Sequence, residues 1–566
     1  MKLTRVPLAL IATTAVASLT LTACGGGSND DNADAAPKNA PKSNALDINK
    51  TDPAKLTQGG TLNWAIDQFS TQWNALEIDG AQLATGYVME SLMPSLWHST
   101  VTGEQVPNKA FLLDAASKTD GGKQVVTYHL NPKAKWSDGT PITYKDLAAN
   151  VKAMSGKDKA YKVGSPAGYD QVASVEKGKD DYEAVITFAT PYADWRALFS
   201  APNNTPLYPA KYMNDAEQFN TAYINKVPVT ANAFKLGGID KTAQTITVVA
   251  DPKWWGDKPK LDKIVFHAMD DASMPAAYAN GEIDYFEIGG DASAFKQASA
   301  VKTGEVREAG GPNYRQLTFN GESEKLKDVK VRQALFKATD RETLAKSVLK
   351  GLNWPAKTLN SHFLVNNQKG YQDNSGGLGT FDPKAAAKLL DEAGWKLDGA
   401  VRKKDGKELS LRFVIPSGVP GSKTEGTILT QLYGEVGVKL NVETVPTNEF
   451  FDKYITPGDF DITPYSLIGT PFAASGSTNI YASNGGNNTA NVGSKKLDDL
   501  LMKASRSTDE AEALKIVNEA DAEAWKLAGV LPIYQRPDIT GAKKTVANLG
   551  AQGMSDVVYE HIGFTK

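Results

Sequence analysis

The pattern of apolar and polar residues between positions 251 and 285 predicts a strand, a helix and a second strand, in that order. Residues 264–268 alternate as a β-strand does. Residues 271–280 carry the signals of a short helix, which ends at an Asn-Gly pair because glycine tolerates the positive φ of a helix C-terminus. Ile283 and Tyr285 then begin another strand. This order predicts a βαβ crossover.

The same patterns predict further elements along the chain. Helices are expected at 80–97, 144–154, 326–335, 382–394 and 424–434, and strands at 59–65, 124–130, 183–188, 313–320, 409–414 and 438–445. Thr143 and Asp146 have the spacing of a capping box that opens the second of these helices. Because strands and helices alternate through residues 311–529, we expect an α/β lobe there.

The length of 566 residues is enough for two or three domains, at roughly 100–200 residues each. The charge is balanced, with 62 basic and 65 acidic residues. A nucleic-acid partner is not expected, because phosphate binding usually requires a basic surplus.

The N-terminus predicts export and a lipid anchor. Lys2 and Arg5 precede an apolar run at 6–21, which is short for a membrane span and typical of a signal peptide. The run ends in Leu-Thr-Ala-Cys at Cys24, which resembles the lipobox of bacterial lipoproteins. The resemblance implies that residues 1–23 are removed and that Cys24 is lipidated. The alternative is an ordinary secretory signal with an incidental cysteine.

Cleavage after residue 23 would leave 60 basic and 65 acidic residues, a net charge of −5, because it removes two basic residues. Cys24 is the only cysteine, so no internal disulfide can form. Residues 24–58 are rich in Gly, Ser, Asn, Asp, Ala, Pro and Lys, and we expect a disordered tether there.

Several motifs resemble one family. Residues 251–264 read D-P-K-W-W-G-D-K-P-K-L-D-K-I, similar to "N-P-x-Y-W-G-G-K-P-x-L-D-x-I", and N-G-E-I-D at 280–284 is similar to "S-G-E-x-D". L-K-D-V-K-V-R-Q-A-L at 326–335 is similar to "L-x-D-x-R-V-R-Q-A-L". The family is the peptide/nickel type (family 5) of extracytoplasmic solute-binding proteins of ABC importers. The chain departs from it at 228–234, which lacks the usual glycines of "P-V-G-T-G-P-Y".

The resemblance implies an α/β, two-lobed periplasmic-binding-protein-like fold of type II, in the large cluster C form with an extra inserted subdomain. It implies a monomer that works with ABC permease subunits at the outer face of the cytoplasmic membrane. The implied parts are lobe I at 59–97, 228–310 and 530–566, the inserted subdomain at 98–227, and lobe II at 311–529.

The resemblance also implies where the ligand binds. Residues 460–474 read F-D-I-T-P-Y-S-L-I-G-T-P-F-A-A, and in peptide-binding relatives a similar "F-D-h" strand leads into a stretch that pairs with the ligand backbone. A polar loop after the first strand would lie at the mouth of the cleft, where Trp73 would line the pocket or be exposed. Alternatively, the loop would cap the core. The expected ligand-binding residues are Asp67, Gln68, Phe69, Tyr465, Ser466, Leu467, Ile468, Gly469 and Thr470.

Thr470 stands where such relatives carry an Asp that holds the α-amino group of a peptide, and Leu467 stands where a Trp is frequent. Asp67 could replace the missing acid, whereas Asp461 begins its strand too far away. The expected ligand is therefore a peptide held differently, or a peptide-like molecule without a free amine. A ligand-binding sensor and a lipoprotein of an envelope-glycolipid pathway on the same fold remain alternatives.

An enzyme is not expected. The five histidines are scattered without metal-ligand spacing, and no G-x-S-x-G nucleophile motif occurs. The Pro-Gly-Ser-Lys-Thr sequence at 420–424 lacks the glycine spacing of a phosphate loop. We therefore expect no catalytic residue, no metal and no cofactor, and a secreted lipoprotein enzyme is the weaker alternative.

Overall fold

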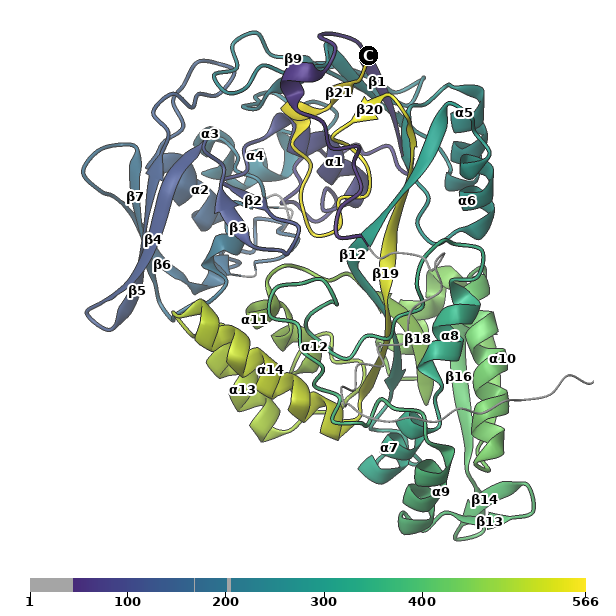
Figure 1. Ribbon diagram of the computed structural model, residues 1–566. Helices are drawn as coiled ribbons and strands as arrows, with labels where there is room; N and C mark the ends of the chain where they lie inside the picture. Colours follow the sequence, from purple (N-terminus) through teal and green to yellow (C-terminus); the bar gives the residue numbers. More distant parts are fainter. Residues whose placement is uncertain (1–43, 167, 201–204) are drawn as a thin grey trace, which may run out of the picture. The chain divides into compact units, whose positions relative to one another are not determined.

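The computed structural model describes residues 44–166, 168–200 and 205–566. The predicted cleavage site and Cys24 lie outside the described residues. A ten-stranded sheet is the central feature of the described chain (Figure 1). In spatial order its strands are β17 (Lys439–Val445), β16 (Ser410–Pro416), β18 (Ile462–Leu467), β12 (Gly304–Phe319), β19 (Val530–Lys543), β11 (Tyr285–Glu287), β1 (Thr61–Ile66), β10 (Lys263–Ala268), β9 (Thr245–Ala250) and β8 (Phe234–Asp240).

Two long strands, β12 and β19, join the lobes. They pair antiparallel from Gly304↔Lys543 at the lobe I end to Thr318↔Val530 at the lobe II end (Figure 1). Strand β12 therefore crosses the implied boundary at 310/311, and β19, which the implied boundary at 529/530 assigns wholly to lobe I, also extends through lobe II, so both strands belong to both lobes. The register shifts between Gly310 and Tyr314, so the ladder is interrupted midway. The strand predicted at 313–320 is the second half of β12, and the sequence pattern missed its first half.

The βαβ crossover is confirmed. Strand β10 and strand β11 both run parallel to β1, which lies between them. Helix α5 (Met274–Asn280) connects them and ends at Gly281, whose φ of 78° is the left-handed conformation that the Asn-Gly pair predicted. Ser273 precedes this helix, but its side chain makes no capping hydrogen bond.

The inserted subdomain has a separate four-stranded sheet with a shared core. Its strands are, in spatial order, β4 (Leu112–Asp120), β5 (Lys123–Leu130), β7 (Glu183–Phe188) and β6 (Val172–Lys177). Its helices are α2 (Tyr144–Met154), α3 (Ala210–Met213) and α4 (Ala216–Thr221). Thr143 and Asp146 form the predicted capping box at α2. Val126 of β5 belongs to the same apolar cluster as Trp64 of β1, so the subdomain packs on lobe I as one core.

The remaining elements complete the lobes. Lobe I has α1 (Leu83–Leu92), α6 (Ala292–Ser299) and the pair β20 (Val546–Ala547) and β21 (Gly563–Phe564), and the pair β2 (Trp97–Ser99) and β3 (Gln105–Pro107) lies beside it. Lobe II has α7 (Val329–Lys337), α8 (Arg341–Val348), α9 (Pro383–Glu392), α10 (Pro420–Glu435), α11 (Ala473–Gly476), α12 (Thr478–Tyr481), α13 (Lys495–Ser505), α14 (Glu510–Leu527) and the small sheet of β13 (Lys396–Asp398), β14 (Val401–Lys404) and β15 (Lys407–Glu408).

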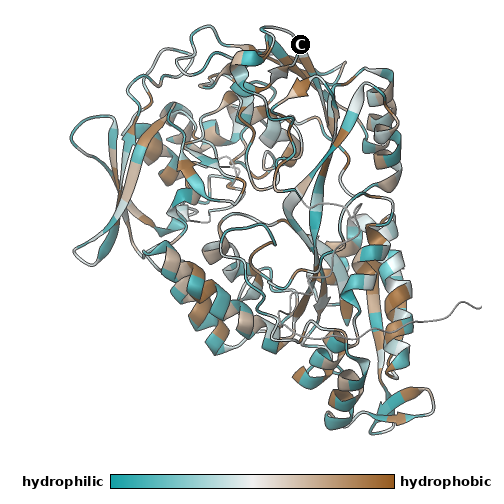
Figure 2. Ribbon diagram, in the orientation of Figure 1, coloured by the Kyte–Doolittle hydropathy of each residue, from teal (hydrophilic) through white to brown (hydrophobic). Residues whose placement is uncertain are grey.

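Helix amphipathicity decides which faces of lobe II are buried. Apolar and hydrophilic residues form separate patches on α13 and α14 (Figure 2). Leu497 and Leu501 of α13 are buried, and they pack in one cluster with Ile516 and Val517 of α14. Leu497 and Leu501 are four residues apart, and Ala513 and Ala520 join Ile516 and Val517 in the cluster at spacings of three and four, so the buried side chains lie on one face of each helix.

The tether prediction is wrong for residues 44–58. Asp47 pairs with Ala551 through backbone hydrogen bonds, and Thr57 bridges to Phe564. Leu56 is only 6% exposed, and Asp52 caps a short 3₁₀ helix over Pro53–Lys55. The prediction fails for two reasons. The few apolar side chains of this polar segment pack against the C-terminal segment, and backbone hydrogen bonding does not depend on side-chain composition.

Three other predictions need correction. Helix α1 is shorter than the predicted 80–97, because Pro94 cannot continue it, and Trp97 already belongs to β2. Trp73 is not at the cleft surface, since it is 1% exposed and packs in the core with its ring edge-on to Phe69. The loop that contains Trp73 therefore caps the core. Helix α10 also begins at Pro420, four residues before its predicted start at 424, because proline is favourable in a first turn.

A buried ion pair connects the crossing strand β12 to helix α10. The Arg315 Nε donates to Glu425 Oε1 at 2.9 Å, and its Nη2 donates to the Ser422 hydroxyl, also at 2.9 Å. The Glu425 side chain is 0% exposed. A carboxylate without water depends on this guanidinium for its charge partner.

We predict that Arg315→Met lowers the free energy of unfolding by about 3–5 kcal/mol, because it leaves a buried carboxylate unpaired. Urea denaturation measures the change. Arg412→Met is the matched control, since Arg412 pairs with Glu443 and Asp459 on the surface and such pairs contribute about 0–1 kcal/mol. Equal losses in the two variants would contradict the prediction.

Candidate ligand-binding cleft

The strand directions bring the carboxyl ends of strands from both lobes together, which makes this place the candidate cleft. Strand β11 is antiparallel to β19, and β1 is parallel to β11, so both run from lobe I toward lobe II. Strand β18 is antiparallel to β12 and runs from lobe II toward lobe I. The carboxyl ends of these strands, at Ile66, Glu287 and Leu467, therefore face the same gap. Ligands of open α/β sheets bind outside the carboxyl ends of the strands.

The predicted binding stretch lies at this gap and against the crossing strand. Strand β18 ends at Leu467, and Ile468 beyond it is 80% exposed. A Cβ atom on Gly469 would come within 2.1 Å of the Pro312 carbonyl oxygen, so only glycine fits there. The Thr470 carbonyl accepts a hydrogen bond from Gln368 Nε2 at 3.3 Å.

One edge of β18 is open beside the gap. The strand pairs with β12 along its length, from Phe319↔Ile462 to Tyr314↔Leu467. On its other edge it meets β16 at one pair, Phe413↔Ile462. Within the described chain, the backbone of Ser466 has no strand partner on that edge. An extended ligand could add to such an edge by main-chain hydrogen bonds.

The predicted residues of the first loop lie on the lobe I side of the gap. Asp67 and Gln68 are exposed, and Phe69 is half-buried against Trp73. Burial raises the pKa of Glu287; the Tyr87 hydroxyl lowers it, and the carboxylates of Asp67 and Asp271 raise it further. The lobe I side is therefore acidic. No hydrogen bond or ion pair in the described chain joins residues 67–69 to residues 465–470.

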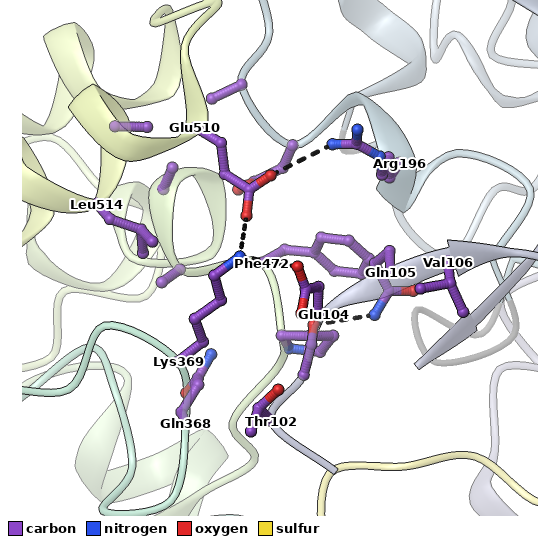
Figure 3. A pocket seen from close by; sticks show the side chains of 17 residues that line it. Thr102, Glu104, Gln105, Val106, Arg196, Gln368, Lys369, Phe472, Glu510 and Leu514 are labelled. Atoms are coloured by element: carbon purple, nitrogen blue, oxygen red, sulfur yellow. Dashed lines mark hydrogen bonds and ion pairs between the residues drawn. The ribbon is translucent and has the colours of Figure 1, made fainter. Parts of the chain in front are cut away.

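A pocket of about 170 Å³ adjoins the end of the binding stretch (Figure 3). Its walls come from the inserted subdomain (102–106 and 193–196), the loop at 368–369, residues 471–474 and the start of α14. None of the predicted site residues lines it, although Pro471 directly follows Thr470. No motif marks these residues, because they come from separate segments of the chain.

Ion pairs across this pocket hold the inserted subdomain to lobe II. Lys369 Nζ lies 2.8 Å from a Glu104 carboxylate oxygen and 3.2 Å from one of Glu510 (Figure 3). Arg196 Nη1 lies 3.6 Å from the other Glu510 oxygen. Glu104 and Arg196 belong to the subdomain, whereas Lys369 and Glu510 belong to lobe II.

Asp194 adds a further contact between the same parts. The Ser475 backbone N–H donates to Asp194 Oδ2 at 2.6 Å, and the Tyr192 hydroxyl lies 3.1 Å from the Ser475 hydroxyl. Burial raises the pKa of Asp194 to about 6, against the hydrogen bonds from Ser475 that lower it. No motif in the sequence marks Asp194, which accepts from a residue just beyond the predicted binding stretch. Asp461 instead accepts from the Arg412 backbone N–H within the sheet.

The described residues offer no metal site. Nowhere in the parts of the chain that the structure describes do three His, Cys, Asp or Glu side chains gather to hold an ion. His362 is buried and bonded to Asp521, and His98 is bonded to Asp556. Among the described helices, none has both the length and the apolar character to cross a membrane.

Two α/β lobes joined by crossing strands, with a cleft at the carboxyl ends of their strands, define a periplasmic-binding-protein-like solute-binding fold. Residues 109–489 match the model of the bacterial extracellular solute-binding proteins, family 5. The chain belongs to this family.

Sequence relatives extend the match over nearly the whole chain. The oligopeptide-binding protein OppA of Mycobacterium tuberculosis is 35% identical over 553 residues, which cover 97% of this chain and 93% of OppA. The probable monoacyl phosphatidylinositol tetramannoside-binding protein LpqW of the same organism is 28% identical over 320 residues, 55% of this chain and 48% of LpqW.

Solved structures have the same fold. The periplasmic EDTA-binding protein EppA superposes with a TM-score of 0.82 at 25% identity, covering 92% of this chain and 98% of EppA. The oligopeptide-binding protein AppA of Bacillus subtilis, in complex with a nonapeptide, gives a TM-score of 0.71 at 20% identity over 90% of this chain and 100% of AppA.

The raised pKa of Asp194 predicts a pH dependence of stability. A carboxyl whose pKa rises from 3.8 to about 6 on folding is penalised when ionised, and the penalty disappears as the pH falls through that value. The melting temperature of the wild type, relative to Asp194→Asn, should therefore rise from about pH 7 to about pH 5. Differential scanning calorimetry between about pH 5 and pH 7 measures the melting temperature of both proteins.

Asp138→Asn is the control for this experiment. The Lys211 ammonium and the Thr140 N–H and hydroxyl lower the pKa of Asp138 to about 2 despite some burial, so this carboxyl does not titrate in that range. Its substitution should leave the slope of melting temperature against pH unchanged. A wild type and an Asp194→Asn variant with parallel slopes would contradict the assignment.

Proposed function

We propose that this protein is a lipid-anchored solute-binding protein that captures a peptide or peptide-like ligand between its lobes and delivers it to the permease of an ABC importer. The observation that carries the proposal is the 35% identity to OppA along 97% of the chain. The cleft supports it, because an open strand edge beside the gap suits an extended main chain. The protein acts by binding and release, without catalysis.

The mechanism rests on the two crossing strands. Ligand bound at the carboxyl ends of β1, β11 and β18 contacts both lobes only when they are together, so it stabilises that arrangement by its differential affinity. The ion pairs of Lys369, Glu104, Glu510 and Arg196 act in the same direction. A permease that recognises the closed arrangement thereby distinguishes loaded from empty protein.

The open edge explains how different peptides could share one site. Hydrogen bonds from Ser466 to a ligand backbone do not depend on the ligand side chains. The neighbouring pocket, lined by Phe472, Leu514 and Val106 among others, offers space for a side chain. Binding through the main chain with one side chain in a pocket gives affinity for a class of peptides.

A second candidate is a lipoprotein of an envelope-glycolipid pathway. The similarity to LpqW favours it, since that relative is described as a probable binder of a mannosylated phosphatidylinositol. The similarity covers about half of each chain, 55% and 48%, and the peptide proposal has the fuller match. Calorimetric titration with peptides and with glycolipid headgroups separates the two.

We predict that Cys24→Ala moves the protein from the membrane fraction to the soluble extracytoplasmic fraction. The reason is that two or more acyl chains are needed for stable anchoring, and the lipobox cysteine would carry them. Fractionation of cells after a carbonate wash is the measurement. A Ser28→Ala variant, outside the lipobox, should stay with the membranes; retention of Cys24→Ala there would show that the anchor is elsewhere.

We also predict that ligand affinity does not require a free α-amine. An ammonium taken out of water needs a paired charge, and Thr470 offers a neutral hydroxyl that accepts from the Phe472 backbone N–H. Calorimetry with one peptide in free and N-acetylated form measures the difference. The two affinities should agree.

A loss of about two orders of magnitude on acetylation, roughly 2.7 kcal/mol, would contradict this prediction. Asp67→Asn and Asp194→Asn would then show which carboxylate holds the amine. Asp67 belongs to the acidic lobe I side of the cleft, whereas Asp194 lies at the pocket end of the binding stretch.

A further inference from the structure

Arg536 has a charged side chain without a partner. No hydrogen bond, ion pair or ring contact to its guanidinium occurs anywhere in the described chain. The residue is half-buried. Its guanidinium nitrogens are not among the fully buried polar atoms that lack a partner, so they are accessible to solvent. A guanidinium presents several N–H donors in a planar fork, and a partly buried guanidinium without an acceptor loses part of its hydration without compensation.

Arg536 lies near one of the strand ends that define the candidate cleft. It lies on β19 between Gln535, which pairs with Tyr314, and Pro537, which pairs with Gly310, so it is opposite the interruption of β12. Its Nη2 is 3.5 Å from where a Cβ on Gly290 would be. Gly290 follows the carboxyl end of β11, which is one of the strand ends that face the gap.

The other arginines of the described chain show that this arrangement is unusual. Arg315 pairs with Glu425, Arg412 with Glu443 and Asp459, and Arg402 with Asp391; Arg332 and Arg341 donate to backbone carbonyls. The Arg506 side chain, at the end of α13, likewise has no described partner, but it is exposed. Among the arginines of the described chain, Arg536 alone combines partial burial with an unpaired charge.

The surroundings of Arg536 are positive. Burial lowers its pKa, the Tyr534 hydroxyl opposes this, and the neighbouring Arg315 lowers the pKa further. Arg315 is already neutralised by Glu425 and has no acceptor to share. The carboxylate of Asp291 is close in sequence to Gly290, but it caps α6 by accepting from the backbone N–H groups of Ser293 and Ala294. No protein carboxylate compensates the charge.

We propose that Arg536 binds an anionic group of the ligand, a carboxylate that pairs with the guanidinium in the closed cleft. This inference rests on the proposed function and adds the ligand chemistry to it. A carboxylate matches the planar fork with two parallel hydrogen bonds, which is the strongest pairing open to arginine. In a peptide the carboxylate is the C-terminus or an acidic side chain, and one experiment can separate these.

The test compares three hexapeptide mixtures of randomised sequence without Asp. The first lacks Glu and has a free C-terminal carboxylate, the second lacks Glu and is C-terminally amidated, and the third is amidated and carries one Glu at any position. Equal amounts are incubated with wild-type protein, Arg536→Gln and the matched control Arg506→Gln. Peptides retained through gel filtration are quantified by mass spectrometry.

Wild type and Arg506→Gln should retain carboxylate-bearing peptides about tenfold over the amidated, Glu-free ones, and Arg536→Gln should retain all alike. Enrichment of the first mixture alone assigns the carboxylate to the C-terminus, and enrichment of the third assigns it to a side chain. Arg536→Gln should melt at the wild-type temperature, because its side chain has no bond to lose. Arg536→Lys, which keeps the charge but not the fork, should reduce the enrichment.

Equal retention of all three mixtures by the wild type, or undiminished enrichment in Arg536→Gln, would overturn the role of Arg536 and leave peptide binding intact. Retention of no peptide from any mixture would overturn the proposed function together with this inference. These outcomes differ in whether wild-type protein holds peptides at all.

Discussion

The pairing of β12 with β19 is the constraint on which the two-lobed structure depends. These strands run through both lobes, and each lobe adds its own strands to one outer edge of the pair. The ladder breaks where Gly310 faces Pro537, because proline has no N–H to donate. Gln535 bridges the break by donating to the Gly311 carbonyl and to Asn367 Oδ1, both at 2.6 Å. The cleft lies where the backbone ladder cannot continue.

Features set by neighbouring residues could be predicted from the sequence. The capping box at Thr143 and the turn at Gly281 depend on local hydrogen bonds and on φ, and both are present. The first half of β12 was missed because Gly310 and Gly311 interrupt the alternation, and partners on β19 far along the chain impose the strand. The composition of residues 44–58 predicts a tether, because composition does not reveal a distant partner such as Ala551.

The candidate site was predictable only in part for the same reason. The resemblance predicts a ligand-binding stretch at 465–470, and the structure places these residues at the carboxyl end of β18, where ligands of open α/β sheets bind. The pocket beside it joins Glu104, Arg196, Lys369 and Glu510, which share no motif and meet only through the fold. Trp73 is a predicted candidate for the cleft surface that the fold removes. It lies in a polar loop, which favours exposure, but packing against the core buries it.

The charged side chains around the cleft fall into two groups: those that pair with each other inside the protein, and those without an ion-pair partner that a ligand could contact. Arg315 and Glu425 satisfy each other, so the charge inside lobe II contributes to folding and has nothing to offer a solute. Asp67, Asp271 and Glu287 on the lobe I side, and Arg536 at the base, have no ion-pair partner in the described chain. A guanidinium at the base and an open strand edge suit an extended solute that carries a carboxylate, and a peptide is such a solute whether or not its α-amine is free. The unpaired guanidinium and the open edge therefore support the same proposed function.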